Sequence, residues 1–252
     1  MDGKKNKITH VIILALLTCV LVVGCTSPEG GVAAENGESS EIEDLTGREK
    51  DWSVLEEELR PCVLQVFCGD YRGSGLVWEI TGEEVTVISS GHLLKNGETC
   101  EVLCREGIYY VARVERVLEN CDVGFAVIPA EMLKEDGVEL REASPCGRGR
   151  EELVQGEELA VYGSMDRVAG NFVKGYLIEA EEEMQFDGYE SAQKLMLGGI
   201  VQNAGTVDAG MSGSGVFDRQ GKLLGILVGG DGETGFAAVP VWEILSECRS
   251  VF

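Results

Sequence analysis

Short apolar runs with a two-residue period dominate the sequence from residue 62 onward. They are rich in Val, Ile, Leu and Tyr, and Gly, Asn or Asp separates one run from the next. This pattern is typical of β-strands joined by tight turns. No long helical pattern separates the runs, so a parallel α/β sheet is disfavoured and one or two antiparallel barrels are favoured. We therefore predict an all-β fold with strands at 62–68, 76–80, 85–89, 99–104, 109–117, 123–128, 159–163, 172–179, 198–202, 215–218, 223–228 and 235–239.

Two short helices are predicted at the ends of this region. Ser53 and Glu56 have the spacing of a capping box, which opens a helix that Arg60-Pro61 ends, because the residue before a proline avoids the helical conformation. A closing helix over 240–250 is predicted from apolar residues with a period near 3.6, at Trp242, Ile244, Leu245 and Cys248.

A long polar stretch, 131–158, divides the predicted strands into two groups. It is interpreted as the link between two halves of one domain that spans 52–252. On this interpretation the first half covers about 62–130 and the second about 159–239.

The first 24 residues have the pattern of an export signal. Lys4, Lys5 and Lys7 precede an apolar run from Val11 to Val23. A membrane-spanning helix needs roughly 20 apolar residues, so this run is too short to be a permanent anchor. The sequence therefore predicts a signal peptide over 1–24.

The end of this segment, Val22-Val23-Gly24-Cys25, resembles a bacterial lipobox, in which the cysteine is lipidated and the chain is cut just before it. The alternative is an ordinary signal peptide that happens to end near a cysteine. The order of small residue, cysteine and polar Thr26-Ser27-Pro28 favours lipidation of Cys25. The expected location is the extracytoplasmic face of the bacterial cell membrane, with the lipid, palmitate included, as the anchor.

Residues 25–51 are expected to form a flexible acidic tether. The stretch 26–50 carries seven acidic and two basic residues with few bulky apolar side chains, which is too little apolar surface to offset the entropy of ordering. Removing residues 1–24 takes away three lysines and one aspartate, so the formal net charge changes from −23 to −25. Such an acidic chain is not expected to bind nucleic acid, because phosphate affinity depends on Lys and Arg.

Ser212 is the candidate nucleophile. It lies in Gly210-Met-Ser-Gly-Ser-Gly215, just before a predicted strand, and glycines on both sides allow a backbone path that exposes its hydroxyl. A hairpin corner is the alternative interpretation of this glycine-rich turn. A serine nucleophile also requires a base, since a free hydroxyl is weakly nucleophilic at neutral pH.

His92 is the one candidate base in the mature chain. The sequence has two histidines, and His10 leaves with the signal peptide. In α/β-hydrolases the histidine follows the serine, whereas His92 precedes Ser212, so the order of that fold is excluded. An isolated histidine of this kind is otherwise interpreted as a buried, hydrogen-bonded core residue.

Asp122 supplies the acid between them. It immediately precedes the predicted strand 123–128, where a carboxylate can accept the Nδ1 proton of the histidine and fix its tautomer. The alternative is a turn aspartate before a strand. The three residues together give the order His92, Asp122, Ser212.

These segments resemble the trypsin-like serine proteases of the chymotrypsin fold, and among them the HtrA/Deg branch. The resemblance covers about 52–245 and implies two antiparallel six-stranded β-barrels. It is carried by Pro61–Val66, a Gly73-Ser74-Gly75 turn, Val87–Leu94, Asp122–Ile128, Ala160–Gly163 with Val173–Gly175, and Gln202–Ile226.

The resemblance also implies roles for further residues. The N–H groups of Gly210 and Ser212 would form an oxyanion hole, and the partner would be a protein or peptide substrate. No cofactor and no metal are implied, and no room is expected for the PDZ domain of typical HtrA relatives. The walls of the substrate pocket would come from Thr206, Asp208, Val228, Gly229 and Gly230.

Three departures from the family pattern motivate other functions. Met211 stands where Asn or Asp is usual, Ser214-Gly215 replaces Gly-Pro, and Ala204 stands where Asp is common. The usual side chain at position 211 helps hold the loop of the oxyanion hole. A catalytically weak or silent surface binding module is therefore the second hypothesis, and an esterase with the same triad is the third.

Seven cysteines remain after Cys19 and Cys25 are set aside. Cys62 and Cys68, like Cys100 and Cys104, are too far apart along one regular strand to form a disulfide, whereas bridges between strands stay open. No Cys-x-x-Cys motif occurs, which disfavours a metal site. By default these cysteines are interpreted as small buried hydrophobic residues. Oxidation or metallation of Cys121 would affect activity, because it is adjacent to Asp122.

Overall fold

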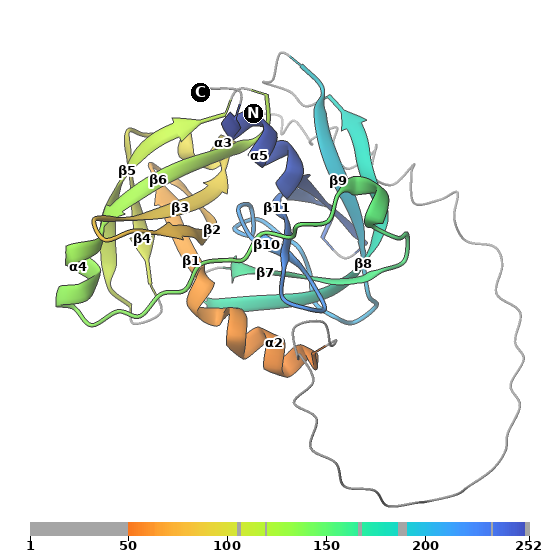
Figure 1. Cartoon of the computed structure of the whole chain (residues 1–252), viewed down its shortest axis with the longest axis horizontal. Helices are drawn as coiled ribbons and strands as arrows, with labels where there is room; N and C mark the ends of the chain where they lie inside the picture. Colours follow the sequence, from red (N-terminus) through yellow and green to blue (C-terminus); the bar gives the residue numbers. More distant parts are fainter. Residues whose placement is uncertain are drawn as a thin grey trace, which may run out of the picture. The chain divides into compact units, whose positions relative to one another are not determined.

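Twelve antiparallel strands build two closed six-stranded barrels, which confirms the predicted fold class (Figure 1). The structure, a computed structural model, describes residues 50–104, 107–118, 120–165, 168–185, 191–232 and 234–249. The predicted signal peptide, Cys25 and nearly all of the acidic tether lie outside these residues. Within the described part of the chain, none of the helices is both long and apolar enough to span a membrane.

Barrel one contains the first six strands, orange to green in Figure 1, in the order β1-β2-β3-β6-β5-β4. Its core arises from the two-residue period. On β4, for example, Cys100 and Val102 are buried while Thr99 and Glu101 face solvent. The strands are β1 Val63–Cys68, β2 Tyr71–Ile80, β3 Glu84–Ser90, β4 Thr99–Leu103, β5 Tyr109–Val117 and β6 Val123–Pro129.

Barrel two contains the last six strands, cyan to blue in Figure 1, in the order β10-β11-β12-β9-β8-β7. Val161, Val173, Met196 and Phe236 are among the buried residues of its core. The strands are β7 Glu158–Met165, β8 Val168–Met184, β9 Gln193–Ile200, β10 Gly215–Asp218, β11 Leu223–Gly230 and β12 Gly235–Pro240.

Four short α-helices flank the barrels: α2 Trp52–Leu59, α3 Gly91–Leu94, α4 Ala130–Glu135 and α5 Val241–Arg249. Helix α2 ends as predicted, at the Arg60–Cys62 turn of 3-10 helix that contains Pro61. Its cap differs from the prediction. Asp51 is the N-cap, and its carboxylate accepts from the backbone N–H of Ser53, so the polar residue two positions before the expected cap satisfies the helix terminus.

Helix α2 packs against barrel two. Leu55 is fully buried beside Gly221, and a methyl group at Gly221 would lie 2.8 Å from its side chain. The guanidinium of Arg219 lies 4.3 Å from the ring centre of Trp52, and the Trp52 ring meets Phe172 edge to face at 5.8 Å. The segment that follows the acidic tether is therefore anchored on β8 and on the turn after β10.

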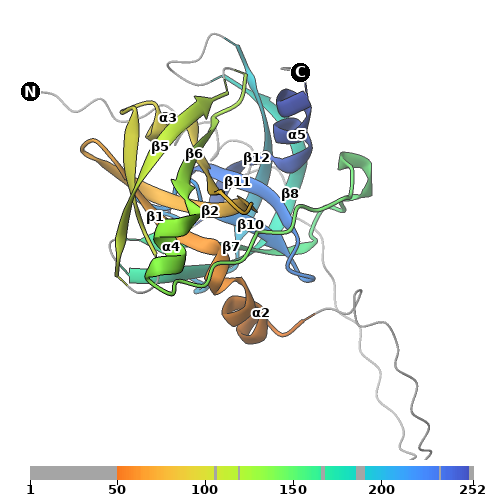
Figure 2. The same ribbon diagram turned by 60° about the vertical axis from the view of Figure 1, so that its left-hand side comes forward.

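The polar segment between β6 and β7 runs from barrel one to barrel two (Figure 2). It contains α4 and a turn of 3-10 helix at Arg150–Glu152. Ala143 N–H donates to Val77 O in barrel one, and Cys146 N–H donates to Leu223 O in barrel two, both at 2.8 Å. The linker thus joins the barrels by backbone hydrogen bonds as well as covalently.

Several boundaries differ from the sequence predictions. Gly73-Ser74-Gly75 was expected as a turn but lies inside β2, which begins at Tyr71. Strand β8 continues to Met184, and β9 begins at Gln193 and ends at Ile200, before the predicted end at 202. The added parts of β8 and β9 place exposed charged residues such as Glu182 among buried residues such as Ala180 and Leu195, so charges interrupt the apolar runs on which the prediction relied.

Candidate active site

His92 and Asp122 form a direct pair. Nδ1 of His92 lies 2.5 Å from Oδ2 of Asp122. Asp122 is 6% exposed, whereas the His92 side chain is 37% exposed. An ionised carboxylate can only accept hydrogen bonds, so in this contact Nδ1 carries the proton and donates it to Asp122. The other ring nitrogen, Nε2, is then left as a potential base.

The same carboxylate also holds the backbone on which His92 stands. Oδ1 of Asp122 accepts from the His92 backbone N–H at 2.5 Å, and Asp122 O accepts from Gly91 N–H at 2.9 Å. A loop was expected here, but residues 91–94 form the single-turn helix α3. The first two backbone N–H groups of this helix have no partner within it and donate to Asp122 instead. Asp122 therefore positions both the ring of His92 and the backbone that carries it.

The Ser212 loop reaches across from barrel two to barrel one. Ser212 O accepts from the Ser74 N–H of β2 at 2.7 Å. A methyl group at Gly73 would lie 2.7 Å from both Ser212 O and the side chain of Leu93, the residue after His92. Glycine at position 73 therefore allows the serine loop to approach the segment that carries the histidine.

Position 213, immediately after Ser212, accepts no residue other than glycine. Its φ is +90°, and a methyl group there would lie 2.0 Å from Ser74 O and 2.4 Å from Ser89 Oγ. Only glycine fits both this left-handed conformation and this contact. The loop at Ser212 is thus held by backbone shape and by close packing on β2 and β3.

No hydrogen bond joins the half-buried Ser212 hydroxyl to the His92 ring among the described residues. Catalytic hydrogen bonds are often long in ligand-free enzymes and tighten when substrate binds. The arrangement brings the predicted acid and base into contact and places the serine loop beside them.

The predicted oxyanion hole has free donors. Among the described residues, neither Gly210 N–H nor Ser212 N–H donates to a backbone carbonyl. Gly210 has a φ of +99°, and its carbonyl oxygen lies 3.2 Å from Ser74 Oγ. Neither of the two amides that the sequence indicated is therefore committed to a backbone acceptor in the described residues.

Met211 is fully buried in the core of barrel two, alongside Val173 and Leu227. Its sulfur accepts from the carboxamide of Asn171 at 3.0 Å. Apolar packing and this contact support the loop at the position where the family usually has a polar residue. The sequence interpretation missed Asn171, because no local pattern distinguishes a polar residue at the start of a strand.

Ser74 is a second residue whose role was not predicted. Its fully buried hydroxyl donates toward Ser164 O at 2.9 Å and accepts from Ser164 N–H at 2.8 Å, in addition to its contact with Gly210 O. It therefore bridges β2, β7 and the serine loop. The Gly-Ser-Gly segment was the available signal, although it was interpreted as a turn.

The two segments expected to line the substrate pocket lie side by side. Val207 N–H donates to Gly232 O at 2.7 Å, and a methyl group at Gly230 would lie 2.7 Å from Val207 Cγ1. Thr206, Val228 and Gly229 are partly buried there, and Asp208 and Gly230 are exposed. The carboxylate of Asp231 accepts from Gly235 N–H at 2.7 Å, so it closes a turn.

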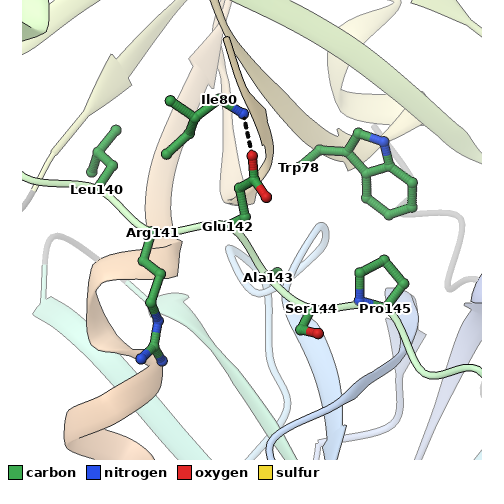
Figure 3. Close-up of a pocket in the computed structure, with 8 residues that line it drawn as sticks. All are labelled: Trp78, Ile80, Leu140, Arg141, Glu142, Ala143, Ser144 and Pro145. Carbon is green, nitrogen blue, oxygen red and sulfur yellow. Dashed lines mark hydrogen bonds between the residues drawn. The ribbon is translucent and has the colours of Figure 1, made fainter.

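A pocket of about 440 Å³ lies away from these residues, between β2 and the linker (Figure 3). Its wall includes Trp78, Pro145 and Glu142, and Glu142 Oε1 accepts from Ile80 N–H at 2.7 Å. None of the predicted catalytic or substrate-binding residues lines it. We therefore do not assign this pocket as the candidate active site, despite its size.

The seven cysteines of the described part are all free thiols. Five of them are buried, in agreement with their interpretation as small hydrophobic residues. Cys121 is 4% exposed, and burial is the main cause that raises its pKa to about 12. Because a thiol is reactive as the thiolate, this residue is protected despite its position beside Asp122.

Two closed six-stranded barrels, with a histidine–aspartate pair in one and a serine loop from the other beside it, define the class of two-barrel peptidases. The sequence pattern of the trypsin-like peptidase domain matches residues 73–226, and the chain belongs to this family of protein-cleaving hydrolases.

Solved structures agree with this fold. The Rv3671c protease of M. tuberculosis in its active form has a TM-score of 0.63 at 13% identity, with 86% of this chain and 93% of that chain covered. The inactive form of the same protease also has a TM-score of 0.63, at 14% identity, with 81% and 97% covered. The likeness to the two forms is equal, so it describes the fold and not the state of the site. No curated relative matches the chain in sequence.

Proposed function

We propose that this protein is a serine endopeptidase that cleaves peptide bonds through the triad His92, Asp122 and Ser212. Ser212 Oγ attacks the substrate carbonyl while Nε2 of His92 accepts its proton. The tetrahedral intermediate collapses as His92 donates that proton to the leaving amine, and a water molecule activated by the same ring then hydrolyses the acyl enzyme. Asp122 stabilises the imidazolium in both halves of the reaction.

The contact between Asp122 and His92 is the observation that carries this proposal. A core histidine needs no buried carboxylate that binds both its ring and its backbone N–H, whereas a catalytic base needs a fixed tautomer and orientation. The exposed side of the ring and the adjacent Ser212 loop support the same conclusion.

Gly210 N–H and Ser212 N–H are the proposed oxyanion donors. Each such donor contributes roughly 3 kcal/mol to transition-state stabilisation in enzymes of this kind. Their freedom from backbone acceptors in the described residues supports this role, because a donor already bound to a carbonyl would have to be released first.

The proposed cleavage specificity is for a small or medium apolar side chain. Val207 is buried against Gly230 in the pocket region, Asp208 beside it is exposed, and Asp231 is committed to the turn with Gly235. A basic side chain would therefore find no buried partner carboxylate in such a pocket. Thr206, Asp208, Val228, Gly229 and Gly230 are the proposed contacts.

The proposed location is extracytoplasmic, with a lipid on Cys25 as membrane anchor and an acidic tether between the anchor and the catalytic domain. This proposal rests on the sequence pattern of residues 4–28. Assignment to the HtrA/Deg branch rests on the motif resemblance. A Cys25→Ser variant is expected to leave the membrane fraction, and its unchanged retention there would refute the anchor.

A fluorophosphonate probe tests the catalytic proposal, because it forms a covalent bond with an activated serine. We expect the protein without its signal peptide to be labelled, the Ser212→Ala variant to be unlabelled, and the control Ser246→Ala, an exposed serine of α5, to be labelled normally. A folded wild-type protein that is never labelled would refute the peptidase proposal.

That last outcome would favour the second candidate, a surface binding module that has kept the fold. Its motivation is the Ser212 hydroxyl, which makes no hydrogen bond to His92 among the described residues. A labelled protein that hydrolyses ester substrates but no peptides would instead indicate an esterase. Rates of hydrolysis measured on peptide and ester substrates side by side distinguish a peptidase from an esterase.

A further inference from the structure

We propose that Asn171 is a positioning residue for the reaction: its carboxamide ties both ends of the loop 206–211 to strand β8 and so holds the oxyanion donors beside Ser212. This inference rests on the proposed function for its catalytic consequence. Its structural content is independent of catalysis and is tested separately below.

The carboxamide of Asn171 spans the loop. Its Nδ2 lies 3.1 Å from Thr206 O and 3.0 Å from Met211 Sδ. A carboxamide nitrogen carries two N–H groups, which matches these two acceptors. Thr206 begins the loop in the pocket region, and Met211 ends it immediately before the nucleophile, so one side chain holds the loop at both ends.

Strand β8 provides a rigid base for this contact. Asn171 is paired with Gly163 of β7 in the barrel. Two residues further along β8, Val173 is fully buried and would contact a methyl group at Gly205 at 3.2 Å. Val173 therefore packs against the start of the loop, while Asn171 provides the hydrogen bonds that orient it.

Met211 transmits the restraint to the catalytic backbone. The residue lies between Gly210 and Ser212, whose N–H groups are the proposed donors, and its own N–H is bound to Asp208 O at 3.1 Å. Thioether sulfur is a weak hydrogen-bond acceptor, so the packing of the fully buried Met211 side chain also restrains its position. Moving Met211 would turn the peptides on either side of it.

The loop is thus held from both barrels. Barrel one binds it through Ser74, whose N–H donates to Ser212 O and whose hydroxyl oxygen lies 3.2 Å from Gly210 O. Barrel two binds it through Asn171. Catalytic groups must be held within about 0.5 Å of productive geometry, and two anchors on separate barrels restrain both the position and the rotation of the loop.

The first experiment measures catalysis in an Asn171→Leu variant, which removes both N–H groups at similar volume. We expect the fluorophosphonate labelling rate and kcat to fall about 10- to 100-fold. The control is Lys174→Gln, an exposed position on the same strand, which should label at the wild-type rate. A labelling rate and kcat unchanged by Asn171→Leu would overturn the catalytic consequence.

The second experiment measures hydrogen exchange of the loop amides, which requires no activity. The N–H groups of Met211 and Gly213 are bonded to Asp208 O and Leu227 O, so we expect both to exchange faster in Asn171→Leu, while barrel-one amides stay unchanged. Unchanged exchange of both loop amides overturns the inference. If the wild type is never labelled, the proposed function fails, and exchange still decides whether Asn171 positions the loop.

A double-mutant cycle with Met211→Leu tests the contact with Met211 separately, and Asn171→Ser takes the place of Asn171→Leu in the exchange measurement and in the cycle if the leucine variant folds poorly. Leucine at position 211 preserves the volume and removes the sulfur acceptor. In that background the loss of Asn171 should change loop exchange less than it does in the wild type. Equal effects in both backgrounds would overturn the contact with Met211.

Discussion

Asp122 binds His92 twice, through Oδ2 to the ring nitrogen Nδ1 and through Oδ1 to the backbone N–H, each at 2.5 Å. A single buried carboxylate therefore sets the tautomer of the ring and the start of the helix that carries it. Asp122 both orients the ring of His92 and fixes the backbone that carries it. A substitution at Asp122 therefore tests both contacts.

Replacing Asp122 with Asn is expected to reduce kcat by about 10⁴-fold with little change in fold, because an amide N–H at Oδ2 would force the proton onto Nε2 and leave no base facing the serine. The measurement is the rate of hydrolysis of a peptide substrate, with circular dichroism as a check of folding. Asp70→Asn, an exposed turn residue, is the matched control and should retain activity. A loss of less than about tenfold would contradict the assigned role of Asp122.

Changing Met211 to Asn, the residue more usual at this place in the family, is expected to destabilise the protein by about 1–3 kcal/mol, because a polar carboxamide would enter an apolar core. Met211→Leu keeps the volume and should cost less than about 1.5 kcal/mol. Denaturant unfolding measures both. Equal stability of the two variants would show that position 211 tolerates a polar group, contrary to its packing in the core of barrel two.

The Gly213→Ala variant is expected to lose labelling and to be less stable by about 2 kcal/mol or more, since the added methyl group meets Ser74 O in a left-handed backbone conformation. Gly82→Ala is the control, because open space surrounds Gly82 and its φ is not in the left-handed range. Its stability should change by less than about 0.5 kcal/mol. A Gly213→Ala protein that labels normally would contradict the packing described for the Ser212 loop.

Alkaline pH is expected to destabilise the protein through its buried thiols. Burial raises the pKa of Cys100, Cys104 and Cys121 from 9.0 to about 12, so the unfolded chain releases these protons at a lower pH than the folded one. Their stabilising contribution is complete below pH 9 and is lost as the pH rises toward 12.

The denaturation midpoint measured at pH 8 to 11 checks this, and alkylation by iodoacetamide at pH 8 should spare all three cysteines until the chain unfolds. Rapid alkylation of Cys121 in the native protein would contradict its burial.

The strand pattern could be predicted from the sequence because each strand buries alternate side chains in its own barrel. The prediction erred where this rule does not apply. Gly73–Gly75 contains no apolar alternation, yet it forms part of β2, because glycine lets the Ser212 backbone approach the strand. At the far ends of β8 and β9, buried residues such as Ala180 and Leu195 stand among charged ones, which obscures the apolar alternation in the sequence.

The candidate triad could be proposed because one of the two histidines lies in the predicted signal peptide, and the order of His92 with Asp122 and Ser212 excludes the α/β-hydrolase arrangement. The supports of the loop could not be found in this way. Asn171 and Met211 lie 40 positions apart, and Ser74 and Ser164 lie 90 apart. Only barrel closure brings these side chains together, and the local sequence does not reveal which residue each of them contacts.

The amino-acid sequence by itself determined the all-β class and the twelve strands, and it indicated the candidate acid, base and nucleophile, because these depend on local periodicity and on the scarcity of histidine. The tertiary structure decided which groups meet: that Asp122 binds both the ring and the backbone of His92, that Ser74 and Asn171 hold the serine loop from opposite barrels, and that Met211 is a core residue. These contacts depend on the closure and packing of two barrels, which bring together atoms from distant strands within a few ångströms.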